Sequence, residues 1–464
     1  MDNKPDCISR RDFIKIIGAG TAGAAIAAGM GGCDSQKKLP LFEEGPSGQM
    51  TYRTDPRSGN KMSLLGFGMM RLPLIQRRRG ESLPDVNDID QEAVNELVDY
   101  AIEHGVNVFH TAPMYGKGFS ETATGEALSR HPRDKYYVAT CLSSQRGPRT
   151  MEHAVSMYNN SFEYLKTDYI DYYFLHNLGS FEAFKSRFLD NGVLDFLFKE
   201  KEAGRIRNLG WSFHGEGDFF EWMAKEYPWD FTMINLNYLN WSRGDWRAGG
   251  GVTDVIAQWM YEVLAEKNIP VWIMGPLMGG ILARVHHKAR ELMMQYDQNA
   301  SPASWGLRFA ASLPNVVTVL SGMTFMDHLK ENISTYSPLV PLREEEKNIL
   351  VEQISQIAHQ YRNINCTRCQ YCTPCPYGID IPGIFTHYNR CMNEGNYPED
   401  RQSEDYRRAR RAFLIGMDRS VPALRQANRC INCRLCVPNC PQRINIPQEM
   451  RRIDKFIEVL RQET

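Results

Sequence analysis

The sequence predicts an α/β protein in which a closed (β/α)8 TIM barrel precedes a smaller, mostly helical unit. Two observations lead to this prediction. Strand-like and helix-like segments alternate from about residue 64 to about residue 335, and eight of the twelve cysteines lie in two short runs after residue 360. Regular alternation of strands and helices is typical of a parallel sheet, and eight such units fit a closed barrel. A length of 464 residues also suits more than one domain.

The predicted strands are short apolar runs at residues 64–69, 106–109, 136–139, 169–175, 206–211, 231–236, 271–274 and 316–320. Apolar residues at helical spacing predict helices between them, at residues 91–104, 122–130, 151–165, 196–203, 219–226, 255–266 and 303–312. Turn-forming residues 55–60 predict a β-hairpin before the first barrel strand, with arms at 50–53 and 62–65. The alternative is a doubly wound open sheet, but no G-x-G-x-x-G segment follows any strand.

Beyond Pro341 the pattern changes to charged helices around the cysteine runs. A charged helix is expected at residues 344–359, and the basic run 407–411 is interpreted as the solvated face of another helix. The predicted division is therefore an N-terminal segment 1–33, a linker 34–49, a barrel 50–340 and a cysteine-rich unit 341–464.

The cysteine runs have the spacing of iron–sulfur ligands. The first is Cys366-x2-Cys369-x2-Cys372-x2-Cys375-Pro376, and the second is Cys430-x2-Cys433-x2-Cys436-x3-Cys440-Pro441. The second is the run of bacterial two-cluster ferredoxins, whose last cysteine ligates the other cluster, and soft thiolates suit such clusters. Two 4Fe–4S clusters are predicted, one held by Cys366, Cys369, Cys372 and Cys440 and the other by Cys375, Cys430, Cys433 and Cys436.

Structural zinc is the alternative for these cysteines, because C-x2-C pairs also bind tetrahedral zinc. Two zinc sites would leave no reason for the third cysteine of each run or for the Cys-Pro endings. A ninth cysteine in this region, Cys391, belongs to neither run and is expected to be an ordinary buried residue.

The N-terminal residues resemble a twin-arginine export signal. Arg10 and Arg11 precede an uncharged stretch rich in Ala and Gly, from Ile16 to Gly32. The alternative is a basic amphipathic N-terminus. Cys33 follows Met30-Gly31-Gly32 as in a degenerate lipobox, which predicts a lipid anchor to the membrane as an option. Export in the folded state suits a protein whose clusters are inserted before transport, and it predicts a periplasmic or membrane-anchored location.

Composition narrows the partners. The chain is 42% hydrophobic and 23% charged, as in soluble globular proteins, and its net charge of −1 gives no sign of nucleic-acid binding. A small-molecule substrate and a redox partner of unknown identity are expected.

Candidate catalytic residues follow three predicted strands. In a (β/α)8 barrel the chemistry lies at the C-terminal ends of the strands, and there the sequence places His110, Cys141 and His176. Tyr115 lies in the same loop as His110, and His214 follows another strand.

These segments resemble the aldo/keto reductase family. The resemblance is carried by residues 109–121 (FHTAPMYGKGFSE), 171–176 (DYYFLH) and 275–280 (GPLMGG), and it extends over about residues 50 to 340. With its cysteine-rich unit, the chain is similar to the iron–sulfur subgroup of that family. The resemblance implies an oxidoreductase with an Asp, Tyr, Lys and His catalytic set and with NAD(P)H as hydride donor.

The chain departs from that set at two positions. Tyr115 and His176 match the family pattern, but His110 stands at the Asp position and Cys141 at the Lys position. In the family the Lys ammonium lowers the pKa of the tyrosine. Its absence argues against ordinary ketone reduction. Three interpretations of His110, Cys141 and His176 stay open: a new acid–base set, a three-ligand metal site, or residues that drifted after catalysis was lost.

The family's cofactor positions are also altered. The position of its carboxamide-binding Asn is Phe213 here, and its basic phosphate-binding positions fall near Gly322 and His328. A helix N-terminus after Ser321-Gly322-Met323-Thr324 still offers amides for a phosphate. The candidate cofactor-binding residues are Ser212, Asn237, Ser321, Gly322, Thr324 and Asn332.

Two functions from different classes follow. One is an exported oxidoreductase that couples a substrate site at the barrel rim, with Trp211, Trp241 and Trp246 available for stacking, to electron transfer through the clusters. The other is a non-catalytic electron-transfer or binding subunit that uses the barrel as a scaffold. A conventional NADPH reductase with an added tail is the third possibility, and the altered residues disfavour it.

Overall fold

The computed structural model describes residues 49–75, 88–143, 150–215, 217–242, 256–361, 363–440, 442 and 444–462. The predicted export signal 1–33 and lipobox, and all but the last residue of the linker 34–49, lie outside the described residues. In the part of the chain that is described, no helix has the length and apolar character needed to cross a membrane.

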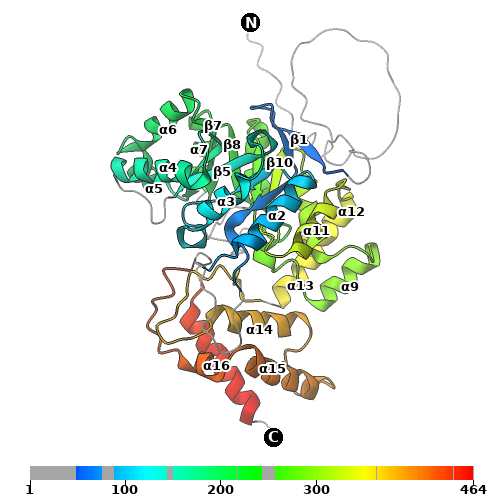
Figure 1. Ribbon diagram of the computed structural model, residues 1–464. Helices are drawn as coiled ribbons and strands as arrows, with labels where there is room; N and C mark the ends of the chain where they lie inside the picture. The colour runs from blue at the N-terminus through cyan, green and yellow to red at the C-terminus, as the bar shows by residue number, and fades with distance from the viewer. Residues whose placement is uncertain are drawn as a thin grey trace, which may run out of the picture.

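The eight predicted strands form a closed parallel barrel, which confirms the fold class (Figure 1). The strands follow one another around it in chain order, and β10 pairs with β3 to close it. They are β3 (Leu65–Gly68), β4 (Val108–His110), β5 (Tyr137–Ser143), β6 (Ile170–Leu178), β7 (Ile206–Phe213), β8 (Phe231–Asn235), β9 (Val271–Met274) and β10 (Val316–Ser321).

The strands β5 and β6 are among those that run further than predicted, and this changes the setting of two candidate residues. Cys141 lies inside β5 and His176 inside β6, because the ladder between these strands continues as far as the pair Ser143 and His176. The prediction that both residues follow their strands was wrong.

A hairpin covers the N-terminal end of the barrel, as predicted. It consists of β1 (Tyr52–Thr54) and β2 (Lys61–Ser63). The buried Arg53 guanidinium donates to the carbonyls of Leu313 and Ala311, both at 2.6 Å. The hydroxyl of Tyr172, from the barrel interior, lies 3.2 Å from Asp55 in the hairpin turn. The hairpin therefore seals this end, and the opposite end remains for a site.

Helices surround the barrel and bury their apolar faces against it. Side chains of Asp90, Thr150 and Ser301 cap the N-termini of three of them, each by accepting a backbone N–H. The helices are α2 (Gln91–Glu103), α3 (Ser120–Leu128), α4 (Met151–Leu165), α5 (Phe181–Phe184), α6 (Val193–Glu202), α7 (Gly217–Glu226), α8 (Ala257–Glu266), α9 (His287–Tyr296), α10 (Pro302–Ala311) and α11 (Met326–Thr335). Of these, α5 and α9 were not among the predicted helices, whereas α11 is the helix expected after Thr324.

The helical segment after the barrel packs with the barrel core. It comprises α12 (Glu344–Asn348), a π-helical stretch (Ile349–Ile354) and α13 (Ser355–Gln360). Ile349, Leu350 and Ile354 belong to the apolar cluster that surrounds the strands, whereas the core of the second unit begins at Ile364. By packing, this segment therefore belongs with the barrel rather than with the unit predicted to begin at residue 341.

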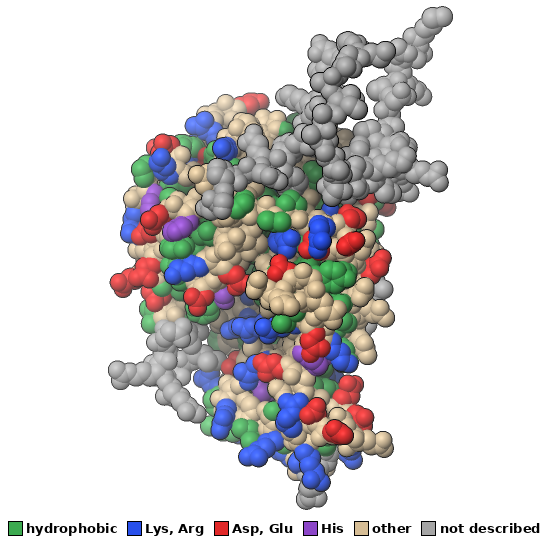
Figure 2. Space-filling view, turned by 90° about the vertical axis from the view of Figure 1, so that its right-hand side faces the viewer, with side chains coloured by type: hydrophobic (Ala, Val, Ile, Leu, Met, Phe, Trp, Pro, Cys, Tyr) green, Lys and Arg blue, Asp and Glu red, His purple; other side chains and the backbone are tan. Residues whose placement is uncertain are grey.

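The second unit lies below the barrel in Figure 1 and is mostly helical. It contains α14 (Ile381–Asn393), α15 (Tyr406–Ser420) and α16 (Ile446–Gln462), whose buried faces meet in one small core. The basic run at the start of α15 exposes Arg407, Arg408 and Arg411, while Ala409 and Phe413 are buried. On the face drawn in Figure 2, positive, negative and hydrophobic side chains are intermixed over both units.

Candidate active site and candidate metal centre

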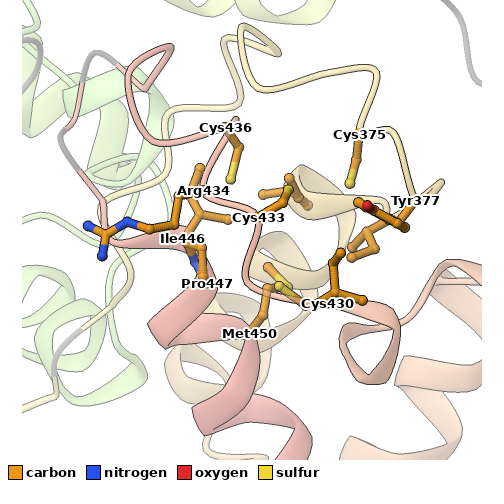
Figure 3. A pocket seen from close by; sticks show the side chains of 12 residues that line it. Cys375, Tyr377, Cys430, Cys433, Arg434, Cys436, Ile446, Pro447 and Met450 are labelled. Atoms are coloured by element: carbon orange, nitrogen blue, oxygen red, sulfur yellow. The ribbon is translucent and has the colours of Figure 1, made fainter.

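The cysteines lie around two cavities in the second unit. Cys366, Cys369, Cys372 and Cys440 line one cavity of about 320 Å³. Cys375, Cys430, Cys433 and Cys436 line the other, of about 290 Å³, and Figure 3 shows their sulfur atoms around it. These are the two groups that the crossover predicts. None of these eight cysteines is joined in a disulfide.

Local backbone geometry folds each run around its cavity. Arg368 and Gln370 in the first run have φ of 56° and 63°, and the equivalent Asn432 and Arg434 in the second run both have φ of 63°. Non-glycine residues in this left-handed region are uncommon, so the same pair of them in both runs indicates that the two loops are built alike.

The chemistry of the cavities fits a cationic metal cluster. Burial raises the pKa of Cys366 and of Cys436 to about 11, and neighbouring cysteines act in the same direction. Four thiolates at one cavity therefore need a positively charged group to compensate them. Iron provides that charge, and soft sulfur ligands suit it.

At the barrel rim three aromatic rings come together. The ring of Tyr115 lies 5.8 Å from that of His110 and 6.2 Å from that of His176, edge to face in both pairs. His214, at the end of β7, is close enough to His176 for the two imidazoles to influence each other's protonation. The structure thus brings His110, Tyr115 and His176 together, as the sequence predicted, and places the further candidate His214 beside them.

The site is electrically neutral at ordinary pH. Burial lowers the pKa of His110 to about 3 and that of His176 to about 4, and His176 depresses His110 further. Burial, with His176 as a second cause, lowers the pKa of His214 to about 3. Burial also raises the pKa of Tyr115 well above its ordinary value, with Cys141 and Tyr371 acting in the same direction. The site therefore offers a neutral phenol and neutral imidazoles.

Cys141 lies in the apolar interior of the barrel, beneath Tyr115. Burial, with Glu121 as a second cause, raises the pKa of its thiol well above the ordinary value. Among the described residues, no group of three or more His, Cys, Asp and Glu side chains is placed to hold a single metal ion. The structure accordingly does not assemble His110, Cys141 and His176 as a ligand set.

The candidate cofactor residues mostly bond within the protein. The Asn332 amide donates to Ser321 Oγ at 3.0 Å, and Ser212 Oγ accepts the backbone N–H of Asn177 at 2.8 Å. Asn237 is fully buried, and its side chain bonds to backbone atoms of its own loop and to the carbonyl of Gly275. Its amide therefore holds the loop after β8 together.

Trp211 does not reach the rim as a stacking surface, Trp241 is partly buried, and Trp246 lies outside the described residues. Trp211 is fully buried against Phe213 and Phe220, and Trp241 packs on Phe309. Side chains alternate along a strand, so Trp211 points outward to the helices instead of into the barrel. The interpretation of Trp211 as a substrate-stacking group was wrong.

The first cysteine run lies directly on the barrel rim. A Cβ placed on Gly279, in the loop after β9, would lie 2.5 Å from Thr367 Cβ and 2.6 Å from Arg71 Nη2. Arg71, just after β3, donates to the carbonyl of Gly279 at 3.1 Å. Burial lowers the pKa of Arg71, and the nearby Cys369 and Cys366 act in the opposite direction. Tyr371 in the same run is near enough to Tyr115 to contribute to the raised pKa of its phenol.

Arg71 also contacts the predicted phosphate-binding loop. A Cβ at Gly322 would meet the side chain of Arg71 at 3.5 Å, and Thr324 Oγ1 donates to the Arg71 carbonyl at 2.9 Å. Sequence reasoning missed Arg71 and Tyr371. The sequence indicated these residues only by their positions: Arg71 follows the first barrel strand, and Tyr371 lies between two cysteines.

A TIM barrel with its candidate site at the C-terminal rim, joined to a unit with two four-cysteine cavities, defines a class of iron–sulfur oxidoreductases. Residues 64–354 match the aldo/keto reductase family, and the chain belongs to this family. Residues 365–445 match the 4Fe-4S dicluster domain, which supports iron–sulfur clusters in the second unit.

Relatives align with the barrel part of the chain. The uncharacterized oxidoreductase YqkF of Bacillus subtilis is 24% identical over 325 residues, which are 61% of this chain and 97% of the relative. Protein tas of Escherichia coli is 24% identical over 335 residues, 62% of this chain and 93% of the relative. The solved aldo-keto reductase AKR11C1 from Bacillus halodurans is similar in fold, with a TM-score of 0.52 and 21% identity over 66% of this chain and 96% of that one.

Proposed function

We propose that this protein couples the oxidation or reduction of a small molecule at the barrel rim to one-electron transfer through two 4Fe–4S clusters. The ligands are Cys366, Cys369, Cys372 and Cys440 for the cluster nearer the barrel, and Cys375, Cys430, Cys433 and Cys436 for the other. When bound, two such clusters supply two one-electron carriers, which together match the two electrons exchanged between a carbonyl and an alcohol.

One observation carries the proposal, namely the seating of the first cysteine run on the rim. Thr367 packs on Gly279 and Tyr371 lies near Tyr115, so the predicted ligand cysteines adjoin the candidate substrate site. Arg71, which also donates to the Gly279 carbonyl, packs on the loop in which a nicotinamide phosphate was expected, near Gly322. This favours an electron supply from the second unit over one from NAD(P)H.

The rim residues then have defined tasks. Tyr115 keeps its proton at ordinary pH and can donate its O–H to a substrate oxygen. His176 and His110 are uncharged, and a neutral imidazole offers one N–H donor and one acceptor. Such a set can orient a carbonyl or alcohol oxygen and exchange its proton with the phenol. The thiol of Cys141 fills the floor of the site.

The test uses the whole, cluster-loaded protein under anaerobic conditions. The clusters are reduced chemically, and their visible absorbance is followed while candidate carbonyl compounds are added. We expect reoxidation that is lost in Tyr115→Phe and in His176→Asn, with unchanged iron content. Tyr164→Phe, on an exposed helix position, is the control. Reoxidation that ignores Tyr115 and His176 would point instead to a non-catalytic electron-transfer subunit.

Nicotinamide use is tested separately, by titrating the same preparation with NADPH and NADH. We expect no saturable binding, because Phe213 stands at the family's carboxamide-binding position and its basic phosphate-binding positions fall near Gly322 and His328. Tight binding of NADPH or NADH, together with hydride transfer from it to a substrate at the barrel rim, would instead support the family's ordinary mechanism.

We also propose export by the twin-arginine route, on the basis of Arg10, Arg11 and the uncharged stretch after them. Lipidation at Cys33 would anchor the exported protein to the outer side of the cytoplasmic membrane. Replacing Arg10 and Arg11 by Lys should keep the protein in the cytoplasm, as fractionation would measure. Export of that variant at the normal level would contradict the proposal.

A further inference from the structure

The two cysteine runs are built alike but face different surroundings. Thr367 and Tyr371 of the first run correspond in spacing to Ile431 and Leu435 of the second. Thr367 is only 8% exposed, because it packs on the barrel. Ile431 is 59% exposed and Leu435 is 60% exposed. The position that the barrel covers in one run is thus open to solvent in the other.

The exposed stretch includes a predicted cluster ligand. All residues from Ile431 to Leu435 are exposed, and Cys433 is one of them. In Figure 3, Tyr377 lies near Cys375 on one side of the cavity and Arg434 extends away on the other. Tyr377 is also 46% exposed. Apolar side chains exposed around a ligand indicate a surface that another molecule covers.

The charge of this surface is one-sided. Residues 419 to 448, both ends included, contain five arginines and no lysine, aspartate or glutamate. Arg429 and Arg434 flank the exposed stretch and are themselves exposed. The chain as a whole carries a net charge of −1, so this density of positive charge is local. A positive patch steers and selects negatively charged partners.

We propose that the surface made by Arg429, Ile431, Arg434 and Leu435 is the docking site for an acidic protein that carries a one-electron redox centre. The inference rests on the proposed function only in assigning a cluster to the second run. Each encounter moves one electron, so that the partner's centre is oxidised by one electron as this cluster is reduced by one, or the reverse. A small transient interface of this kind suits electron transfer.

Cys433 decides between a protein and a lipid surface. A basic and apolar patch also suits anionic membranes. Binding to a lipid surface does not require an exposed cluster ligand at the centre of the contact. An electron carrier, in contrast, must come close to the cluster, and Cys433 marks the point where it can.

The experiment uses the cluster-loaded protein and an acidic flavodoxin as the probe. Binding is measured by fluorescence anisotropy at low and high ionic strength, with vesicles of phosphatidylglycerol and phosphatidylcholine as a second probe. We expect binding to flavodoxin that weakens with salt, and a loss of about tenfold or more in Arg429→Glu and in Arg429→Glu/Arg434→Glu. Leu435→Ser should weaken binding without changing its salt dependence.

The control is Arg407→Glu/Arg411→Glu, which reverses two exposed charges on α15 and leaves the proposed surface unchanged. Iron content is measured for every variant, and the single Arg429→Glu variant lies outside the cysteine run. Equal weakening by the control, unchanged binding by the Arg429 variants, or binding to vesicles in place of flavodoxin would each overturn the proposal. Because the readout is binding, the outcome is independent of any substrate reaction at the barrel.

Discussion

A single methyl group at Gly279 should separate the barrel from the first cysteine run. Gly279 has φ of 67°, and an added Cβ would lie 2.5 Å from Thr367 Cβ and 2.6 Å from Arg71 Nη2. Carbon atoms in van der Waals contact lie about 3.5 to 4.0 Å apart. The variant Gly279→Ala therefore pushes Thr367 and its loop away from the rim by about 1 Å.

The expected effect follows from that displacement. Alanine in the left-handed region costs about 1 to 2 kcal/mol, which a folded barrel tolerates. A misplacement of about 1 Å between groups that must act together can reduce a rate by roughly 100-fold. The reoxidation of reduced clusters by substrate should fall by that order, while iron content and barrel folding stay unchanged.

Gly192→Ala is the matched control. Gly192 has φ of 73°, so alanine meets the same backbone strain, but nothing lies within 4 Å of its added Cβ. Cluster reoxidation is followed by stopped-flow absorbance, and folding by circular dichroism. If Gly279→Ala reoxidises its clusters at the wild-type rate, the contact at Thr367 is not the route between the units.

Three further predictions test other parts of the molecule. Arg71→Gln should lower the reduction potential of the barrel-side cluster by tens of millivolts, because a nearby cation stabilises the more negative reduced state. Arg71→Lys keeps the positive charge and should leave the potential close to the wild-type value. A spectroelectrochemical titration measures both potentials. Burial raises the pKa of Glu121 to about 7, so the stability from its protonation is present at low pH and lost as pH rises through 7. The unfolding free energy of wild type should therefore fall between pH 5 and pH 8, by roughly 2 to 3 kcal/mol relative to that of Glu121→Gln. Urea titrations at both pH values measure this, and a difference that does not change with pH would contradict the prediction. Cys372→Ser should lose about half of the bound iron, whereas Cys391→Ser, at a buried cysteine outside both cavities, should lose none.

The strands could be predicted from the sequence because each is a short apolar run between polar turns. The helix α9 could not, since His287-Lys288-Ala289-Arg290 at its start is polar and only Ala289 and Met293 are buried. The π-helical segment 349–354 packs with the barrel because its apolar residues meet the outer core, and no local pattern tells which of two cores a helix joins.

The cysteine groups were predictable because ligand spacing is a local property of the chain. The setting of the first group was not, since it depends on residues almost 300 positions apart, such as Arg71 and Thr367. Cys141 illustrates the same limit. Sequence places it at the position of a catalytic lysine, but only packing reveals that it is an uncharged thiol in an apolar interior.

This barrel differs in the position of its positive charge from the Asp, Tyr, Lys and His catalytic set that the family resemblance implies. A cation beside Tyr115 would lower the pKa of the phenol and make it an acid for hydride chemistry. That position is Cys141, and the phenol pKa is raised instead. Arg71 places a partly buried cation elsewhere, against Cys366 and Cys369. There it would stabilise negative charge on a reduced cluster through the same electrostatics, so under the proposed function this cation would act on the cluster and not on the phenol.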